Sequence, residues 1–341
     1  MKALFLDAAS TFRLGEYTDP DANSSSKLRL KVQAVTVCGS DLHYYKEGSI
    51  GSSIVHQPAI LGHEFSAVVD DERGAEFGFP KGTLVAVDPA EPCGHCEWCE
   101  SGYANLCPKV KFSGSAPIQG AMREVFYAKP SLLFKVPENF DAADAALLEP
   151  LGVALHAVDL AKIKLGGNVA VVGAGAIGLL MLQVARVAGA GSIHVVEPFE
   201  YRRELALKLG AYSAHETTQS LLEFTNKRGV DVVLEATDSS TGPQAACNVA
   251  RIGGKVVLVG IPDGDRFDLT ASSIRRKGLT IKMSRRMGHV YPRAIQLVAK
   301  KLVNIKAIAT HHFSLANAPE AFKLQETRSD GVIKSVIHLE D

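Results

Sequence analysis

Four of the six cysteines in this 341-residue chain fall within one short stretch, at Cys93, Cys96, Cys99 and Cys107. Two residues between successive cysteines let adjacent thiolates turn back onto one tetrahedral ion, and the fourth thiolate closes the cage. A pair of disulfides is the alternative, but the rest of the chain is typical of a cytosolic protein, where disulfides are rare. Four sulfurs leave a zinc ion no open coordination position. The spacing therefore predicts a structural zinc, and catalytic chemistry must lie elsewhere.

A glycine-rich loop, Gly173-Ala-Gly175-Ala-Ile177-Gly178, follows the apolar run 169–172 and precedes an expected helix. The first glycine permits a tight turn, the second lets backbone amides approach a pyrophosphate, and the third lets the helix pack on the strand. The unpaired N–H groups at the helix N-terminus favour phosphate. We therefore expect a dinucleotide here, with Ile177 among the residues that contact it.

An acidic residue, Glu197, ends the next expected strand about twenty residues further on, as the dinucleotide fingerprint requires. Its carboxylate can accept both ribose hydroxyls and would repel a 2′-phosphate, which favours NAD over NADP. Arg202 and Arg203 leave tolerance of NADP open, since an arginine can pair with that phosphate or simply lie on a solvated helix face. Val259, at the end of a later strand, completes the expected cofactor-binding set.

A second group of possible metal ligands is spread over the first half of the chain: Cys38, His63, Glu64 and Glu149. Taken singly, each has an ordinary explanation as a small buried residue, a hydrogen-bonded pair or a helix-end carboxylate. Together, and followed by a nucleotide-binding segment, they fit a catalytic zinc with soft and hard ligands and an open position for water or substrate.

The elements that must position these residues divide the chain into three parts. Residues 1–148 read as short strands separated by turns, with the cysteine lobe at about 88–110. Residues 149–283 alternate apolar strands and helices, the pattern of a doubly wound parallel sheet, and residues 284–341 form a C-terminal segment that returns to the first part. An alanine-rich helix is expected at 142–161, capped by Asp141. The fold class is therefore α/β with a separate β-rich domain.

Composition excludes several other classes of protein. The formal net charge is zero, with neither a basic stripe nor a block of like charges, so nothing marks a nucleic-acid or membrane surface. The N-terminal apolar run is too short for a signal peptide and is interrupted by Asp7, and the most apolar stretch carries the glycine loop rather than a membrane span. We expect a cytoplasmic protein with reduced thiols.

These motifs together resemble the zinc-dependent medium-chain alcohol dehydrogenases along essentially the whole chain. The resemblance is carried by Cys38-Gly-Ser-Asp-Leu-His-Tyr-Tyr45, Gly62-His-Glu64, the cysteine lobe, Glu149-Pro150 and the glycine loop. It implies a GroES-like β-rich catalytic domain and a Rossmann domain. Within the superfamily the chain is similar to the sorbitol (polyol) dehydrogenase and L-idonate 5-dehydrogenase branch, because simple alcohol dehydrogenases usually have cysteine where this chain has Glu149.

The resemblance implies two zinc ions per subunit, one structural and one catalytic. Cys38 and His63 are expected to bind the catalytic zinc, and Glu64 is the third ligand in sorbitol dehydrogenase-like sites. Glu149 then either binds the zinc directly or holds its water molecule. The sequence does not decide between the two carboxylates.

The implied reaction is the reversible oxidation of a secondary alcohol of a polyol or sugar acid to a ketone, with hydride transfer to NAD. The proton is expected to leave through Ser40 and then His43, whose type has an ordinary pKa near 6.5; the alternative for His43 is a surface histidine. Tyr44, Phe112 and Arg286 are the candidate substrate contacts. The adjacent Arg285 adds a second cation that could serve a carboxylate, although a solvated turn explains both arginines equally well.

Two other interpretations stay open. A related dehydrogenase of the superfamily could act on threonine or on a simple secondary alcohol, or the fold could persist as a non-catalytic zinc-binding protein. The expected partners are a small-molecule substrate and further copies of the chain, since the family associates as homotetramers or homodimers.

Overall fold

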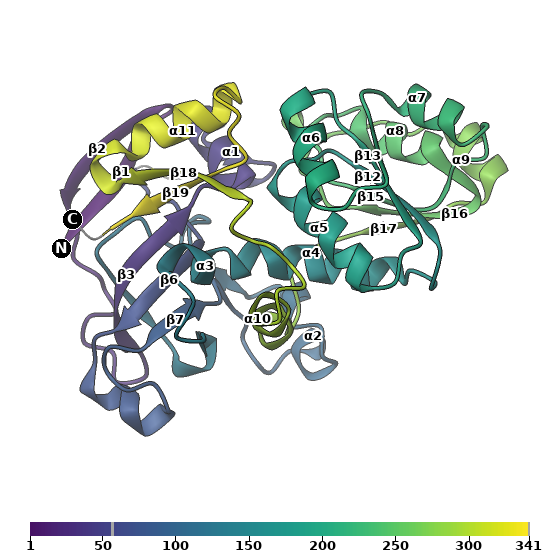
Figure 1. Ribbon diagram of the computed structural model, residues 1–341. Coiled ribbons are helices and arrows are strands. Elements are labelled where there is room, and N and C mark those ends of the chain that lie inside the picture. The colour runs from purple at the N-terminus through teal and green to yellow at the C-terminus, as the bar shows by residue number, and fades with distance from the viewer. Residues whose placement is uncertain (56–57, 340–341) are drawn as a thin grey trace. The chain divides into compact units, whose positions relative to one another are not determined.

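The computed structural model describes residues 1–55 and 58–339, which form two compact units (Figure 1). The first unit contains Met1–Glu149, Tyr291–Ile295 and the described chain from Ile305 onward. The second contains Pro150–Val290 and Gln296–Asn304. Each unit has its own sheet, and the predicted metal ligands all belong to the first.

The first unit is built around one mostly antiparallel sheet with the strand order β11-β7-β6-β3-β19-β18, and β10 also pairs with β3. Only β18 and β19 run parallel to each other among these pairs. Its strands are β3 (Leu28–Thr36), β6 (Glu64–Val69), β7 (Leu84–Val87), β10 (Val125–Ala128), β11 (Leu133–Lys135), β18 (Ala309–Ser314) and β19 (Lys334–His338). Three two-stranded pairs accompany it: β1 (Lys2–Ala8) with β2 (Thr11–Glu16), β4 (Ser49–Ile50) with β5 (Ser53–Ile54), and β8 (Ala90–Glu91) with β9 (Lys111–Phe112).

The core of this unit lies between the sheet and the segments that cover it. Alternating residues of β3, including Leu28, Leu30 and Val32, are buried together with Phe65 and Phe322, as expected for strands with one face turned to a core. The helices of this unit are α1 (Gly39–Glu47), α2 (Glu97–Glu100), α3 (Ala142–Ala146), the first two residues of α4 (Leu148–Ala161), the first part of α10 (Tyr291–Ala299) and α11 (Ala318–Thr327). The central strands thereby provide a rigid base for the loops that carry the site.

The single helix expected at 142–161 is wrong in one respect, because the structure contains two helices that meet at Leu147. Proline inside a continuous helix would remove one backbone hydrogen bond and clash with the carbonyl four residues earlier. By restarting at Leu148, α4 places Pro150 in its first turn, where proline is tolerated. Asp141 caps α3 as predicted, since its Oδ1 accepts the amide of Asp144 at 2.8 Å.

The second unit is a six-stranded parallel sheet with helices, in the strand order β14-β13-β12-β15-β16-β17. Counted along the chain this is the order 3-2-1-4-5-6 of the Rossmann fold, so the predicted doubly wound sheet is confirmed. The strands are β12 (Asn168–Val172), β13 (Ser192–Val196), β14 (Ser213–His215), β15 (Val230–Glu235), β16 (Ala250–Leu258) and β17 (Thr280–Met283). The helices are α4 from Pro150 onward, α5 (Ala176–Val187), α6 (Glu200–Lys208), α7 (Thr218–Phe224), α8 (Gly242–Val249), α9 (Ala271–Lys277) and the end of α10 from Gln296.

Short 3₁₀ helices complete the description, at Glu72–Phe77, Ala104–Leu106, Pro130–Leu132, Asp263–Asp265 and Leu315–Asn317. Among the residues described, no helix combines the length and the apolar character that crossing a bilayer requires.

Candidate active site

The four cysteines of the lobe converge as their spacing predicts. The Sγ atom of Cys96 lies 3.5 Å from that of Cys99 and 3.8 Å from that of Cys107, and the Sγ atoms of Cys93 and Cys99 are 4.0 Å apart. A disulfide would bring two sulfurs to about 2 Å, and all six cysteines of the chain are free thiols. Zinc–sulfur bonds of about 2.3 Å set the edge of a tetrahedral cage near 3.8 Å. The donor set therefore fits a zinc ion.

The second group of predicted ligands gathers where two neighbouring strands of the first sheet meet α1. Cys38 is the residue before α1 and comes just after β3, while His63 and Glu64 lie at the start of β6. One donor atom from each of the three lies within 4.8 Å of the others. His63 and Glu64 are buried and Cys38 is half-buried. One sulfur, one imidazole and one carboxylate thus converge, a set that suits zinc with a position left open.

An aspartate that sequence reasoning missed organises this group. Asp41 is fully buried, accepts the backbone amides of Cys38 at 3.1 Å and Gly62 at 3.2 Å, and lies 3.4 Å from Nδ1 of His63. Burial alone would lower the pKa of His63, but the negative charges of Asp41 and Cys38 raise it well above its ordinary value. A carboxylate on the far nitrogen of a ligand histidine fixes its ring and tautomer. The sequence contains a signal for Asp41, because it lies three residues after Cys38 and so in the position that a capping box requires.

A lysine from the C-terminal end of the chain was also missed. Lys334 on β19 is buried, and its Nζ donates to Glu64 Oε1 at 2.8 Å and to the carbonyl oxygen of Val37 at 3.1 Å. Thr36 donates its hydroxyl to the other oxygen of Glu64. Burial lowers the pKa of Lys334, but Glu64 and Cys38 attract the ammonium strongly enough to raise it above its ordinary value. Glu64 is therefore held on both oxygens by its surroundings.

Glu149, the other predicted carboxylate, lies in the first turn of α4 and is buried. Burial and the negative charge of Glu64 raise its pKa to about 8, although His63 and Lys334 act in the opposite direction. Glu149 is therefore close enough to Glu64, His63 and Lys334 for their charges to change its pKa. The donor atoms that lie within 4.8 Å of one another nevertheless include Glu64 and not Glu149. The choice of third ligand stays a prediction.

Two further predicted residues lie against His63. The Ser40 hydroxyl is 3.4 Å from His63 Nε2, and the ring of Phe112 lies 5.2 Å from the imidazole, centroid to centroid. His43, one turn along α1, is buried and has its Nδ1 4.0 Å from a carboxylate oxygen of Glu47, so its interpretation as a surface side chain is wrong. The predicted relay residues thus share one short helix beside the ligand group.

The remaining substrate candidates belong to different units. Tyr44 is buried in the first unit, where its hydroxyl is 2.9 Å from those of Ser53 and Ser115. Arg286 is half-buried in the second unit and its backbone has φ = 54°. The structure therefore places Tyr44 in a hydroxyl cluster, and a role for Arg286 stays a prediction.

In the second unit, the glycine loop has the geometry that a pyrophosphate requires. Gly173 has φ = 90°, and a Cβ on Gly178 would lie 1.9 Å from the carbonyl oxygen of Gly173, so neither position accepts a side chain. A Cβ on Gly175 would meet nothing within 4 Å. The backbone at Gly173 and Gly178 thus leaves no room for a side chain, whereas the space beside Gly175, where α5 begins, is free for a ligand to approach.

Glu197 ends β13 beside this loop. Its carboxylate accepts the amide of Ala174 at 2.7 Å and that of Phe199 at 3.1 Å. Arg202 Nη1 lies 3.9 Å from the same carboxylate and its guanidinium lies over the Phe199 ring, while Arg203 donates to the carbonyl oxygen of Glu197 at 2.8 Å. Both arginines therefore have partners of their own, which argues against a solvated helix face.

The last two predicted cofactor residues lie at the same edge of the parallel sheet. Ile177 is in the first turn of α5, and Val259 follows β16, where its amide donates to the carbonyl oxygen of Glu235 at 2.9 Å. The C-terminal ends of parallel strands form the usual ligand edge of an open α/β sheet.

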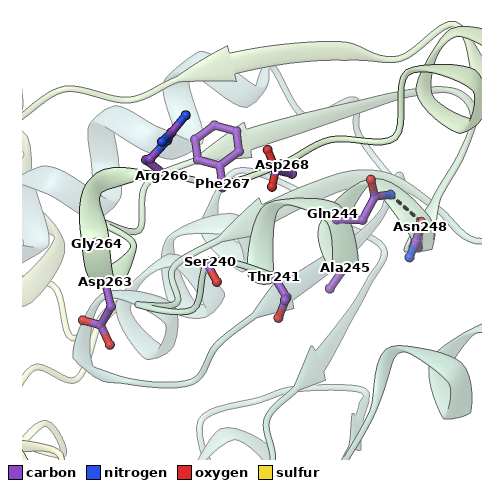
Figure 2. A pocket seen from close by; sticks show the side chains of 10 residues that line it. All are labelled: Ser240, Thr241, Gln244, Ala245, Asn248, Asp263, Gly264, Arg266, Phe267 and Asp268. Carbon is purple, nitrogen blue, oxygen red and sulfur yellow. Dashed lines mark hydrogen bonds between the residues drawn. The ribbon is translucent and has the colours of Figure 1, made fainter.

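A cavity of about 660 Å³ also opens in the second unit, between α8 and the segment 263–268 (Figure 2). Polar, charged and apolar residues line it, and the polar and charged ones include Ser240, Thr241, Gln244, Asp263, Arg266 and Asp268. Figure 2 shows Gln244 bonded to Asn248 along α8. None of the predicted site residues lines this cavity, so the candidate site is defined by the converging side chains rather than by the open volume.

Comparison with known proteins gives the same architecture. The family described as "Alcohol dehydrogenase GroES-like domain" matches residues 24–138, and the family described as "Zinc-binding dehydrogenase" matches residues 176–300. The chain belongs to the zinc-dependent medium-chain alcohol dehydrogenases, in the polyol dehydrogenase branch, and is a dehydrogenase.

Individual relatives agree with this class. Sorbitol dehydrogenase of Bacillus subtilis is 34% identical over 95% of this chain and 93% of its own length. A probable D-xylulose reductase A of Aspergillus clavatus is 35% identical over 93% of this chain and 91% of its own length. The solved structure of an Escherichia coli oxidoreductase/dehydrogenase of unknown specificity involved in membrane biogenesis is 30% identical and has a TM-score of 0.91, covering 100% of this chain and 99% of that one.

Proposed function

We propose that this protein reversibly oxidises a secondary alcohol of a polyol or sugar acid to a ketone and transfers the hydride to NAD. The observation that carries the proposal is the convergence of Cys38, His63 and Glu64 in a buried group whose donors suit a zinc ion with an open position. Similarity to a sorbitol dehydrogenase and a D-xylulose reductase supports a polyhydroxylated substrate.

Zinc, when bound by these residues, supplies a Lewis acid that lowers the pKa of a hydroxyl group, and NAD supplies the hydride acceptor. Ser40, whose hydroxyl adjoins the ligand His63, accepts the proton of the substrate alcohol as it releases its own hydroxyl proton. His43 takes the proton onward along α1. Asp41 keeps the His63 ring oriented through its 3.4 Å contact with Nδ1.

The preference for NAD rests on Glu197. Its carboxylate is buried beside the glycine loop, and we expect it to accept ribose hydroxyls and to repel a 2′-phosphate. The cysteine lobe would hold the second zinc of each subunit, in a structural role. A tetramer or dimer and a cytoplasmic location stay predictions, which sedimentation and cell fractionation would check.

A substrate panel tests the proposal. Purified protein with NAD is offered sorbitol, xylitol, L-idonate, threonine and 2,3-butanediol, and the reduced nicotinamide is followed by absorbance while zinc per chain is measured by mass spectrometry. We expect two zinc ions per chain and a kcat/KM on one polyol or sugar acid at least about tenfold above that on butanediol, since one satisfied hydroxyl contact is worth that much or more. Preference for threonine or butanediol would contradict the substrate class.

The non-catalytic alternative has its own test in the same assay. A protein that binds two zinc ions but reduces no NAD with any member of the panel, and no NADP either, would favour it. Loss of turnover after chelation of one zinc ion would exclude it.

A further inference from the structure

Lys334 is a charged side chain buried directly against the predicted catalytic ligands. It is 3% exposed, and its Nζ lies 2.8 Å from Glu64 Oε1 and 2.6 Å from Oε2. A buried charge is tolerated only when it is paired and hydrogen-bonded. Its position 270 residues from Glu64 in the sequence means that only the folded sheet brings the two together.

The strand order explains how this contact arises. β6, β3 and β19 are consecutive neighbours in the first sheet, with Thr36 opposite Glu64 on one side and opposite Val336 on the other. Lys334 is two residues from Val336 and therefore points to the same face. From there its ammonium reaches both Glu64 and the carbonyl oxygen of Val37, the residue before Cys38. It thus ties together the two segments that carry the ligands.

The charges of the site give this contact a chemical meaning. The Cys38 thiolate and the Glu64 carboxylate would together neutralise a zinc ion, and Lys334 adds a further buried positive charge against Glu64. Before any metal is bound, the Glu64 carboxylate would be an unpaired buried charge without a cation beside it. Lys334 supplies that cation, and it also occupies lone pairs of Glu64 that would otherwise be free for the metal.

We propose that Lys334 is a positioning residue that holds Glu64 in place and weakens it as a zinc donor, so that the bound zinc remains a strong Lewis acid. The inference rests on the zinc site of the proposed function. The Lys334 ammonium group lies next to a predicted ligand, where its positive charge repels the metal ion. Removing it should tighten zinc binding while slowing the reaction. A lysine that only supported the fold would have the opposite effect on zinc, since its loss would loosen the ligands.

The test replaces Lys334 by methionine, which keeps the length without the charge, and by arginine, which keeps the charge. For Lys334→Met we expect zinc affinity, measured by competition with a chelator, to rise roughly tenfold or more. We expect kcat to fall roughly tenfold with the KM for NAD unchanged, and the visible bands of the Co²⁺-substituted protein to shift. Lys334→Arg should restore zinc affinity and bands to the wild-type values. Weaker zinc binding or unchanged bands in the methionine variant would overturn the proposal.

Arg123→Met provides the matched control. Arg123 forms a buried ion pair with Asp19 at 2.6 Å in the same unit, so this variant also leaves a buried carboxylate unpaired. It should lower stability without changing zinc affinity or the cobalt bands, and a change equal to that of Lys334→Met would count against a specific role. Should Lys334→Met fail to fold, Lys334→Gln replaces it with the same expectations, and a departure of Lys334→Arg from wild-type zinc affinity by more than about tenfold overturns the proposal by itself.

Wild-type protein separates this inference from the proposed function. If the wild type binds only one zinc ion or reduces no NAD, the proposed function fails and with it the premise. If the wild type binds two zinc ions and is active but Lys334→Met loses zinc, the inference alone fails.

Discussion

The two groups of predicted metal ligands in this molecule are assembled in opposite ways. The cysteine cage is local, with all four sulfurs between Cys93 and Cys107 and with α2 and short turns closing the lobe. The Cys38 group is non-local, since its donors follow β3, begin β6 and are held by Lys334 on β19. A local cage can stabilise only its own lobe, whereas a site held by the central sheet gains rigidity from the whole unit. This difference suits a structural ion in the first case and a catalytic ion in the second.

The largest effect that this comparison predicts is loss of turnover without loss of fold. Cys38→Ala removes the only sulfur of the non-local group while the sheet beneath it stays intact. We expect kcat to fall by roughly a thousandfold or more, because Lewis-acid stabilisation is worth several kcal/mol. Zinc should fall from two ions per chain to one, measured by mass spectrometry, with circular dichroism unchanged.

Cys247→Ala is the control for that prediction, because Cys247 is buried in the second unit and far from either group in sequence. It should leave both zinc ions and turnover in place. If Cys38→Ala kept two zinc ions, the non-local group would not be a metal site.

Breaking the local cage should give the reverse result. Cys96→Ala leaves three sulfurs, so the lobe loses its closure and its zinc. We expect the midpoint of thermal unfolding to fall by about 5 °C or more, while freshly purified protein keeps its catalytic zinc and a kcat within about threefold of wild type. A Cys96→Ala variant with unchanged thermal stability and no turnover would invert the roles of the two groups.

The same contrast explains how far the sequence predicts the site. The cage, the glycine loop and the parallel sheet are local patterns, and the structure contains each of them where the sequence indicates. Asp41 was missed although it lies in a capping-box position, because a capping role did not suggest a ligand-orienting one. Thr36 and Lys334 carry no local signal, since their meaning depends on the order of three strands distant in sequence. The break at Leu147 follows from Pro150, which helical periodicity alone does not register.

A smaller effect is expected at the cofactor site of the second unit, which contains no predicted metal ligand. Glu197→Ala removes the charge that would repel a 2′-phosphate, so the ratio of kcat/KM for NAD to that for NADP should fall by roughly ten- to a hundredfold. Glu197→Gln can still accept the amide of Ala174 and should keep the loop ordered while losing the repulsion. Steady-state kinetics with both cofactors measures the ratio. A wild-type enzyme that already prefers NADP would contradict the role of Glu197.

The smallest expected effect concerns acid stability, and it separates the two units. His194 on β13 is buried, with its Nδ1 2.8 Å from the Ser213 hydroxyl and its Nε2 3.1 Å from that of Ser192. Burial, and to a lesser degree the nearby His215, lowers its pKa from 6.5 to about 4. The folded protein therefore binds fewer protons here than the unfolded chain, so the stabilising contribution is complete above pH 6.5 and is lost as the pH falls toward 4.

Because the Ser192 and Ser213 hydroxyls can also accept hydrogen bonds from a protonated His194, we expect this contribution to be about 1–2 kcal/mol rather than the full value of the shift. Acid also releases zinc by protonating its ligands, so the measurement compares chelator-treated wild type with chelator-treated His194→Gln, by urea unfolding from pH 7.5 to 4.5. The variant should have a flatter dependence on pH, and the difference should appear in the unfolding transition of the second unit if the two units unfold separately. Identical slopes in the two proteins would mean that the acid sensitivity of this dehydrogenase belongs to its ligand-bearing unit, and that the sheet which carries the glycine loop does not contribute to it.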